Sequence, residues 1–235
     1  FIERRKNIRG IIGAMDIDLN NLKALLNKKK TKTVSGIDFD YGTIYNKEVV
    51  IAKCGIGKVF ASICAQTMIL IFKPEYIINT GVAGTLTNEL SVGDMAISRS
   101  VVQHDMDTSA LGDPVGLISG INVVNFNAGK YLVALAEQVI KDNNINFKTG
   151  VIASGDQFIA TKKQKDKIIS DFNAVACEME GGSIGHTAYI NNVEFVVIRA
   201  ISDSADDSSF MDYPAFLKMA AEKSTNVTLD LISRI

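Results

Sequence analysis

The chain has 235 residues, of which 47% are hydrophobic and 22% charged, and its formal net charge is -1. A chain of this length and composition can bury a sizeable core, which excludes a protein that is mainly disordered. Because the net charge is close to zero, no overall field recruits nucleic acid or an anionic membrane, and neither is expected as a partner.

The three cysteines, Cys54, Cys64 and Cys177, are scattered and form no CxxC pair. This pattern argues against a disulfide framework and a zinc site and favours a reducing, cytoplasmic location. No apolar run reaches the ~20 residues that span a bilayer, and the basic start lacks the apolar segment of a signal peptide. We expect one domain over residues 1–235, with residues 1–8 as an N-terminal extension.

Short apolar runs alternate with longer amphipathic runs, a pattern that predicts strands followed by helices. The first half is predicted to contain a strand at 8–14, a helix at 16–27, a hairpin at 33–54, a helix from 58 to about 72 and a strand at 76–79. The second half is predicted to contain strands at 92–102, 150–154, 174–178 and 195–201 and helices at 130–142, 161–170, 181–189 and 213–233. Residues 105–127 are expected to be a long loop, and lysines 28–30, 162, 163, 165 and 167 to lie on solvated helix faces.

Such an alternation predicts an α/β fold: a single-domain three-layer sandwich in which helices flank a central mixed sheet. In sheets of this kind, ligands bind at the carboxyl ends of the strands. Functional side chains are therefore expected just after the predicted strands.

Acidic residues follow three of the predicted strands. They are Asp16 and Asp18, then Glu178 and Glu180, and finally Asp203. Each also has a simpler explanation, as a helix cap, a first-turn acid or a turn residue. Their shared position at strand ends favours a common site.

Other residue patterns are less specific. The loop Gly55-Ile56-Gly57-Lys58 lacks the third glycine of a dinucleotide fingerprint and the Ser/Thr of a P-loop. His104 and His186 are the only histidines and have no metal-ligand spacing. No Ser or Cys lies in a nucleophile-elbow pattern. Acid–base chemistry by carboxylates is therefore favoured over covalent catalysis.

Several ordered segments closely resemble the bacterial 5'-methylthioadenosine/S-adenosylhomocysteine nucleosidases, members of the nucleoside phosphorylase superfamily. The resemblance runs from about residue 9 to the C-terminus, in the family's order and spacing. The segments are Gly10–Met15, Ile77–Gly84, Val92–Asp94, Ser154–Ile159, Cys177–Gly181 and Val197–Asp203.

The resemblance implies hydrolysis of the N-glycosidic bond of 5'-methylthioadenosine and S-adenosylhomocysteine to adenine and the thioribose product, with no cofactor. Asp203 would be the general acid at adenine N7, Asp18 the base that activates water, and Glu180 the ligand of the ribose hydroxyls. The chemistry is consistent with these roles, since an oxocarbenium-like transition state needs a proton donor at the base and an activated water.

The remaining residues of the implied substrate site surround these three. Phe158 and Ile159 would bind adenine, Ser202 would position Asp203, and Arg199 would hold the carboxylates in place. The others are Met15, Val82, Ala83, Gly84, Glu178, Met179, Met211 and Tyr213, of which Met211 and Tyr213 would border the 5' substituent. The family is usually a homodimer, so a partner's residues near His104–Leu111 are expected to close the 5' pocket.

The sequence departs from the family at the water-activating position, where the family usually has Glu and this chain has Asp18. A misplacement of this size can cost ~10²-fold in rate. Gly182 and Gly185 stand where Ala is commoner in the family, which should weaken that helix by ~1 kcal/mol each.

Three alternatives remain open. A purine nucleoside phosphorylase needs converging cations for phosphate; only Arg199 lies near a motif, but Lys58 and Arg99 leave the question arguable. A nucleoside-binding protein with weakened catalysis is favoured by Asp18 and opposed by Glu180 and Asp203. The substrate could also be aminodeoxyfutalosine.

Overall fold

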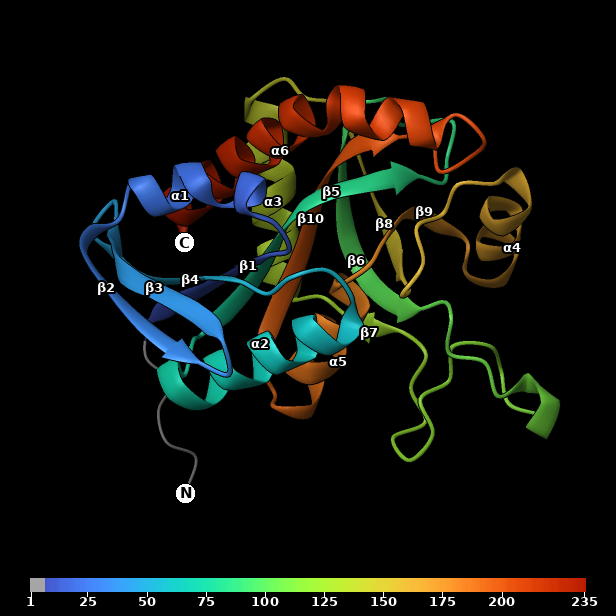
Figure 1. Ribbon diagram of the computed structural model, residues 1–235, viewed down its shortest axis with the longest axis horizontal. Coiled ribbons are helices and arrows are strands. Elements are labelled where there is room, and N and C mark those ends of the chain that lie inside the picture. Colours follow the sequence, from blue (N-terminus) through green and yellow to red (C-terminus); the bar gives the residue numbers. More distant parts are fainter. Residues whose placement is uncertain (1–6) are drawn as a thin grey trace.

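The computed structural model describes residues 7–235, apart from the side chains at positions 210 and 211 (Figure 1). The strands are β1 (Ile8–Gly13), β2 (Asn27–Val34), β3 (Ile37–Ile44), β4 (Lys47–Lys53), β5 (Tyr76–Thr85), β6 (Met95–Gln103), β7 (Phe126–Asn127), β8 (Phe147–Ser154), β9 (Ala174–Glu178) and β10 (Glu194–Asp203). The helices are α1 (Asn20–Ala24), α2 (Lys58–Phe72), α3 (Lys130–Asp142), α4 (Lys162–Phe172), α5 (Gly181–Ile190) and α6 (Ser209–Arg234), with 3-10 turns η1 (Asp16–Asp18) and η2 (Ser109–Leu111).

Strand β5 is the junction of the mixed sheet. It pairs in parallel with β1 on one side and with β10 on the other, and its end also pairs antiparallel with β9. Because β10 continues through β6 and β8 to β9, the pairing closes a ring, from which β1, β4, β3 and β2 extend outward. The carboxyl ends of β1, β5, β9 and β10 consequently lie close together.

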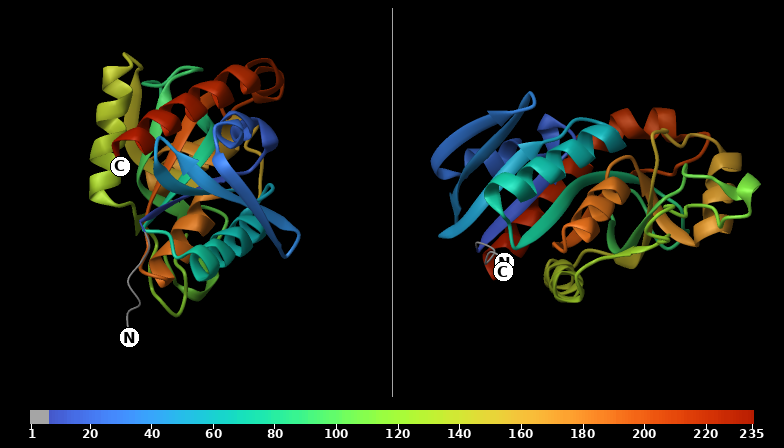
Figure 2. Two further views of the ribbon diagram at one scale, coloured as in Figure 1. Left: turned by 90° about the vertical axis from the view of Figure 1, so that its left-hand side faces the viewer. Right: turned by 90° about the horizontal axis from the view of Figure 1, so that it is seen from below.

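Helices cover both faces of the sheet, as expected for a three-layer α/β sandwich. One buried core lies between the sheet and helices α2 and α5, and a second lies under α1, α3 and α6. Figures 1 and 2 show these two groups of helices on opposite sides, with α4 at the far end from β2 and β3. None of the helices within residues 7–235 is both long and apolar enough to cross a membrane.

The predicted helix at 16–27 is wrong beyond its first turns. Residues 16–24 form η1 and the short α1, and the chain then enters the edge strand β2, so lysines 28–30 lie on a strand. The leucine spacing that indicated a helix corresponds to helical structure over little more than one turn, in α1. The β-branched Thr31 and Thr33 then donate hydrogen bonds of 2.6 Å to Asp40 and Asp38 across the β2–β3 pair.

Two other boundaries differ from the expectation. Strand β5 runs on through the Thr80–Gly84 motif, which lies within the strand because β10 pairs with it along that length. Of the extension expected at 1–8, Ile8 opens β1, whereas residues 1–6 lie outside the described residues.

The glycines of α5 allow this helix to lie close to the sheet. A Cβ on Gly185 would lie 2.5 Å from Val101 Cγ2 and 2.7 Å from Phe195 Cζ, and one on Gly182 would lie 2.7 Å from the Val102 carbonyl oxygen. The helix propensity that these glycines forgo is therefore offset by packing that an alanine would obstruct.

We predict that Gly185→Ala destabilises the protein. The gain of ~1 kcal/mol in helix propensity is outweighed by an overpacking cost of about 1–3 kcal/mol, so Tm measured by thermal unfolding should fall by a few degrees. Thr187→Ala, on the same helix, adds propensity without an overlap and is the control. An unchanged or higher Tm for Gly185→Ala would contradict the packing argument.

Candidate active site

One pocket collects the residues that follow the central strands. It lies at the carboxyl ends of β1, β5, β9 and β10, and its wall is completed by residues 157–159 and by α6. The lining residues are Ala14, Met15, Asp18, Ile56, Val82, Ala83, Gly84, Gln157, Phe158, Ile159, Cys177, Glu178, Met179, Glu180, Arg199, Ser202, Asp203 and Tyr213. Every site residue expected from the sequence is among them except Met211, whose side chain lies outside the described residues.

The Asp18 carboxylate is buried at the end of η1. Its Oδ2 accepts a hydrogen bond of 2.9 Å from the Met15 backbone N–H, whereas its Oδ1 has no partner. Burial raises the pKa of the Asp18 carboxyl above its usual value, against the opposing effects of the Met15 N–H and the Arg199 charge. One fixed oxygen and one unpartnered oxygen suit a group that takes a proton from a water in the pocket.

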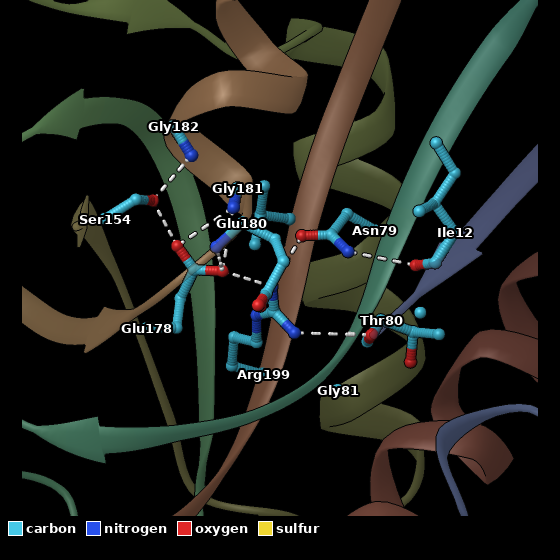
Figure 3. Close-up of polar contacts among 12 residues, drawn as sticks. Ile12, Asn79, Thr80, Gly81, Ser154, Glu178, Glu180, Gly181, Gly182 and Arg199 are labelled. Atoms are coloured by element: carbon cyan, nitrogen blue, oxygen red, sulfur yellow. Dashed lines mark hydrogen bonds and ion pairs between the residues drawn. The ribbon is translucent and has the colours of Figure 1, made fainter. Parts of the chain in front are cut away.

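Arg199, on β10, is the central cation of the site and is 1% exposed. Its Nη2 donates to Glu178 Oε2 and to Asn79 Oδ1 (2.6 Å), and lies 3.5 Å from Glu180 Oε2 (Figure 3). The guanidinium lies so close to β5 that a Cβ on Gly81 would overlap Nη1 and would lie 3.7 Å from Asp18 Cγ. Glycine at position 81 thus makes room for the arginine next to the Asp18 carboxylate.

Glu178 is fully engaged by the protein itself. Its two carboxylate oxygens accept hydrogen bonds from the Ser154 hydroxyl, from the backbone N–H groups of Glu180 and Gly181, and from Arg199. The two N–H groups belong to the start of α5, where the helix dipole favours negative charge. Glu178 therefore anchors Arg199 and the α5 N-terminus at the edge of the pocket.

Glu180 retains capacity for a ligand. Its Oε1 accepts a hydrogen bond of 3.0 Å from the Gly57 N–H, and its Oε2 has only the long contact with Arg199. Gly57 has a φ of +100°, a conformation that glycine adopts readily. Burial, and next the neighbouring Glu178 charge, raise the pKa of Glu180 to about 7.

Asp203 ends β10 and is held by its own neighbours. Its Oδ2 accepts a hydrogen bond of 2.9 Å from the Ser202 hydroxyl, and its Oδ1 accepts one of 2.9 Å from the Ala205 N–H. Ala205 has a φ of +51°, a left-handed conformation that costs a non-glycine residue roughly 1–2 kcal/mol. The loop after β10 is thus bent so that its backbone faces the carboxylate.

Apolar and aromatic groups form the other walls. The Phe158 and Tyr213 rings meet edge to face with centroids 5.4 Å apart, and the Tyr213 hydroxyl lies 3.6 Å from Met15 Sδ. Ile159 and Val82 are buried beside them. The pocket therefore combines apolar and aromatic walls with carboxylates, as a ligand with a planar base and a polyhydroxyl part would require.

Four lining residues were not among those expected: Ala14, Ile56, Gln157 and Cys177. Each adjoins a motif that was identified. The sequence alone allowed the Gly55–Lys58 loop to be a plain turn. Its contact with the site, from the Gly57 N–H to Glu180, depends on the fold and has no sequence signal. Within residues 7–235, no group of three or more His, Cys, Asp or Glu side chains is arranged to hold a metal ion.

Fold and site together define an α/β enzyme of the kind that acts on nucleosides, and comparison with known proteins agrees. Residues 8–233 match the family model described as the phosphorylase superfamily. The chain is 42% identical over 227 residues to the 5'-methylthioadenosine/S-adenosylhomocysteine nucleosidase of Staphylococcus aureus strain JH9. The aligned region covers 96% of this chain and 99% of that protein.

Solved structures show the same relationship. A Helicobacter pylori nucleosidase variant with 5'-methylthioadenosine in its active site matches with a TM-score of 0.94 at 33% identity, over 98% of this chain and 100% of that one. The Neisseria meningitidis 5'-methylthioadenosine/S-adenosylhomocysteine nucleosidase, in complex with methylthio-immucillin-A, matches with a TM-score of 0.94 at 30% identity, over 98% and 100%. The chain belongs to the 5'-methylthioadenosine/S-adenosylhomocysteine nucleosidase family of the phosphorylase superfamily.

We predict that Arg199→Met strongly destabilises the protein, because it leaves buried carboxylates without their counter-charge. Removing one partner of a buried ion pair costs about 3–5 kcal/mol. Lys58→Met, which breaks the partly exposed 2.6 Å ion pair with Asp105, should cost roughly 1 kcal/mol or less and is the control.

The deficit of Arg199→Met should also depend on pH. The Arg199 charge lowers the pKa values of Asp18 and Glu180, so both carboxyls should take up protons at higher pH without it. A protonated carboxyl needs no counter-charge, and chemical denaturation should therefore show a larger loss of stability at pH 8 than at pH 5.5. An equal loss at both pH values would contradict the role given to Arg199.

Proposed function

We propose that this protein hydrolyses the N-glycosidic bond of 5'-methylthioadenosine and S-adenosylhomocysteine, releasing adenine and the thioribose product. The observation that carries the proposal is the charge of the pocket. Four carboxylates line it, those of Asp18, Glu178, Glu180 and Asp203, and Arg199 is the one cationic side chain of the described residues that does so. Such a site favours a neutral nucleoside and a water.

The same observation opposes the phosphorylase alternative. The terminal nitrogens of Arg199, Nη1 and Nη2, donate to protein oxygens, and its Nε is buried. Lys58 Nζ is engaged by Asp105 at 2.6 Å and by Gln103 at 3.2 Å and does not line the pocket. Arg99 is exposed on β6, likewise outside the pocket lining. A phosphate site needs converging free cations, and the described residues that line this pocket do not provide them.

The proposed reaction divides its proton transfers between two carboxyls. Adenine lies against Phe158 and Ile159, and Asp203 gives a proton to N7 as the C1'–N9 bond breaks and its electron pair passes to the base. A water adds to C1' of the oxocarbenium-like sugar, and its proton passes to the unpartnered Oδ1 of Asp18. Glu180 holds the ribose hydroxyls, and each acid–base group contributes ~10²–10⁴-fold in rate.

We predict that the protein releases adenine from 5'-methylthioadenosine in phosphate-free buffer and that Asp18→Asn lowers kcat by ~10²–10⁴-fold. The control is Asp16→Asn, two residues away, where the carboxylate is exposed and paired with Lys53. Adenine and free sugar are followed by chromatography.

Other results would contradict this proposal in distinct ways. Strict dependence on phosphate, with a sugar 1-phosphate formed, would indicate a phosphorylase. Tight binding of 5'-methylthioadenosine without adenine release would indicate a binding protein.

We also propose that the enzyme acts as a homodimer in the cytoplasm, where its three unpaired, buried cysteines would stay reduced. Helix α2 exposes Val59 (70%), Phe60 (56%) and Leu70 (65%), and Tyr189 and Ile190 on the adjacent α5 are about half exposed. An apolar surface of this kind favours a second copy of the chain.

The segment His104–Leu111 supports the same proposal. None of its residues lines the pocket of its own chain, and Figure 1 shows the connection between β6 and β7 reaching away from the sheet. Lys58 ties Asp105 to the start of α2, so the segment is continuous with the apolar surface of that helix. We propose that in a dimer this segment closes the partner's 5' pocket, since Ile56 and Phe158 are left exposed at the pocket of a single chain.

We predict that Phe60→Glu converts the protein from twice its chain mass of 25.5 kDa to once that mass in light scattering coupled to size exclusion. The glutamate would place an unpaired charge in the interface. Leu25→Glu, at an exposed position beyond α1, is the control and should leave the mass unchanged. A monomeric wild-type protein, or an unchanged mass for Phe60→Glu, would contradict the dimer.

A further inference from the structure

Asn79, in the middle of β5, is a fully buried polar side chain that does not line the pocket. Its amide is used at both ends. Nδ2 donates a hydrogen bond of 2.9 Å to the Ile12 carbonyl on β1, and Oδ1 accepts one of 2.6 Å from Arg199 Nη2. Asn79 therefore fixes the guanidinium to the backbone of the neighbouring strand, as Figure 3 shows.

The hydrogen bond between Asn79 and Arg199 affects the other partners of Arg199, because Nη2 has a limited number of protons to donate. A guanidinium Nη carries two N–H groups, and three oxygens lie around Nη2. Those of Glu178 and Asn79 are in close hydrogen-bond contact, whereas Glu180 Oε2 is 3.5 Å away. The two protons are thus taken by Glu178 and Asn79, and Glu180 receives no close hydrogen bond from the arginine.

We propose that Asn79 is a positioning residue for the reaction, because it occupies the second Nη2 proton of Arg199 and so leaves Glu180 Oε2 open to a ribose hydroxyl. The amide is neutral, so it holds the arginine without competing for its charge. The inference rests on the proposed nucleosidase function for its kinetic consequence, but the arrangement itself can be tested without turnover.

Two nearly isosteric variants should act in opposite directions. In Asn79→Leu, Nη2 loses an acceptor and its free proton turns to Glu180 Oε2, which should lower the pKa of Glu180. Asn79→Asp keeps the acceptor but adds a carboxylate that shares the charge of Arg199, and this should raise the pKa of Glu180. Displacements of about one unit are expected for changes of this kind next to a buried carboxyl.

The other ionisable groups around Glu180 stay the same in both variants. They are Glu178 on β9, Arg199 on β10, Asp18 in η1, Cys54 after β4 and Tyr213 on α6. A difference between the two variants therefore reports on position 79.

The first measurement is the titration of the Glu180 carboxyl by NMR in protein labelled with ¹³C-glutamate, with Glu180→Gln to assign the signal. The second is the pH dependence of adenine release from 5'-methylthioadenosine. For Asn79→Leu, we expect KM to rise about tenfold with a smaller change in kcat, because Glu180 is withdrawn from the ribose.

Thr80→Val is the matched control. Thr80 is the next residue on β5 and is also fully buried. Its hydroxyl forms hydrogen bonds with the hydroxyls of Ser224 and Thr228 on α6 and does not contact Arg199. This variant should lower Tm and leave the Glu180 titration in place.

Opposite displacements of the Glu180 titration in the two Asn79 variants would support the inference. Displacements in the same direction, or none, would overturn it and leave Asn79 a structural residue like Thr80. If Asn79→Leu does not fold, Asn79→Asp still decides, since a Glu180 titration that does not rise overturns the inference. A wild-type protein that releases no adenine would refute the proposed function and leave the NMR result to judge the arrangement of Arg199.

Discussion

The buried guanidinium of Arg199 is the interaction on which the site depends. A cation that is 1% exposed is tolerated in a protein interior only if its charge and its N–H groups are compensated. Glu178 supplies the opposite charge, and Glu178, Asn79 and the Thr80 carbonyl accept the hydrogen bonds of Nη1 and Nη2 from β9 and β5, which leaves Nε as the one nitrogen of the guanidinium without a partner among the described residues. The requirement extends to the backbone, because a side chain on Gly81 would overlap the guanidinium.

Around this cation, four carboxylates differ in what they can do. Glu178 is saturated by hydrogen bonds from the protein, and Asp203 is held through both oxygens by Ser202 and Ala205. Asp18 has an unpartnered oxygen, and Glu180 has one with only a long contact. The four carboxyls are thus distinguished by their hydrogen bonds, although all four are of the same chemical kind: Glu178 is an anchor, Asp203 is fixed in position for its proposed proton transfer, and Asp18 and Glu180 keep an oxygen available to water or ligand.

Much of the fold could be predicted from the sequence, because strongly apolar runs bounded by turn residues indicate their own structure. Phe195–Ile201 was expected as a strand and is the core of β10, and Lys130–Asp142 was expected as a helix and is α3. The prediction failed at residues 25–30, where leucine spacing suggested a longer helix and the lysines a helix face. From Asn27 onward this segment forms a strand because it pairs with β3, and a pairing between strands cannot be identified from the local residue pattern.

By itself, the sequence determined which residues stand at the ends of strands, and hence that Asp18, Glu180 and Asp203 share one edge of the sheet. It also determined the chemical kind of site, since carboxylates were its only candidate acid–base groups. Only the tertiary structure decided how those carboxylates differ. Burial, the position of Arg199 between β5, β9 and β10, and the Gly57 N–H at Glu180 all arise from contacts between segments more than twenty residues apart in the chain. A hydrogen bond or a pKa depends on which groups meet in space, and the fold alone brings these groups together.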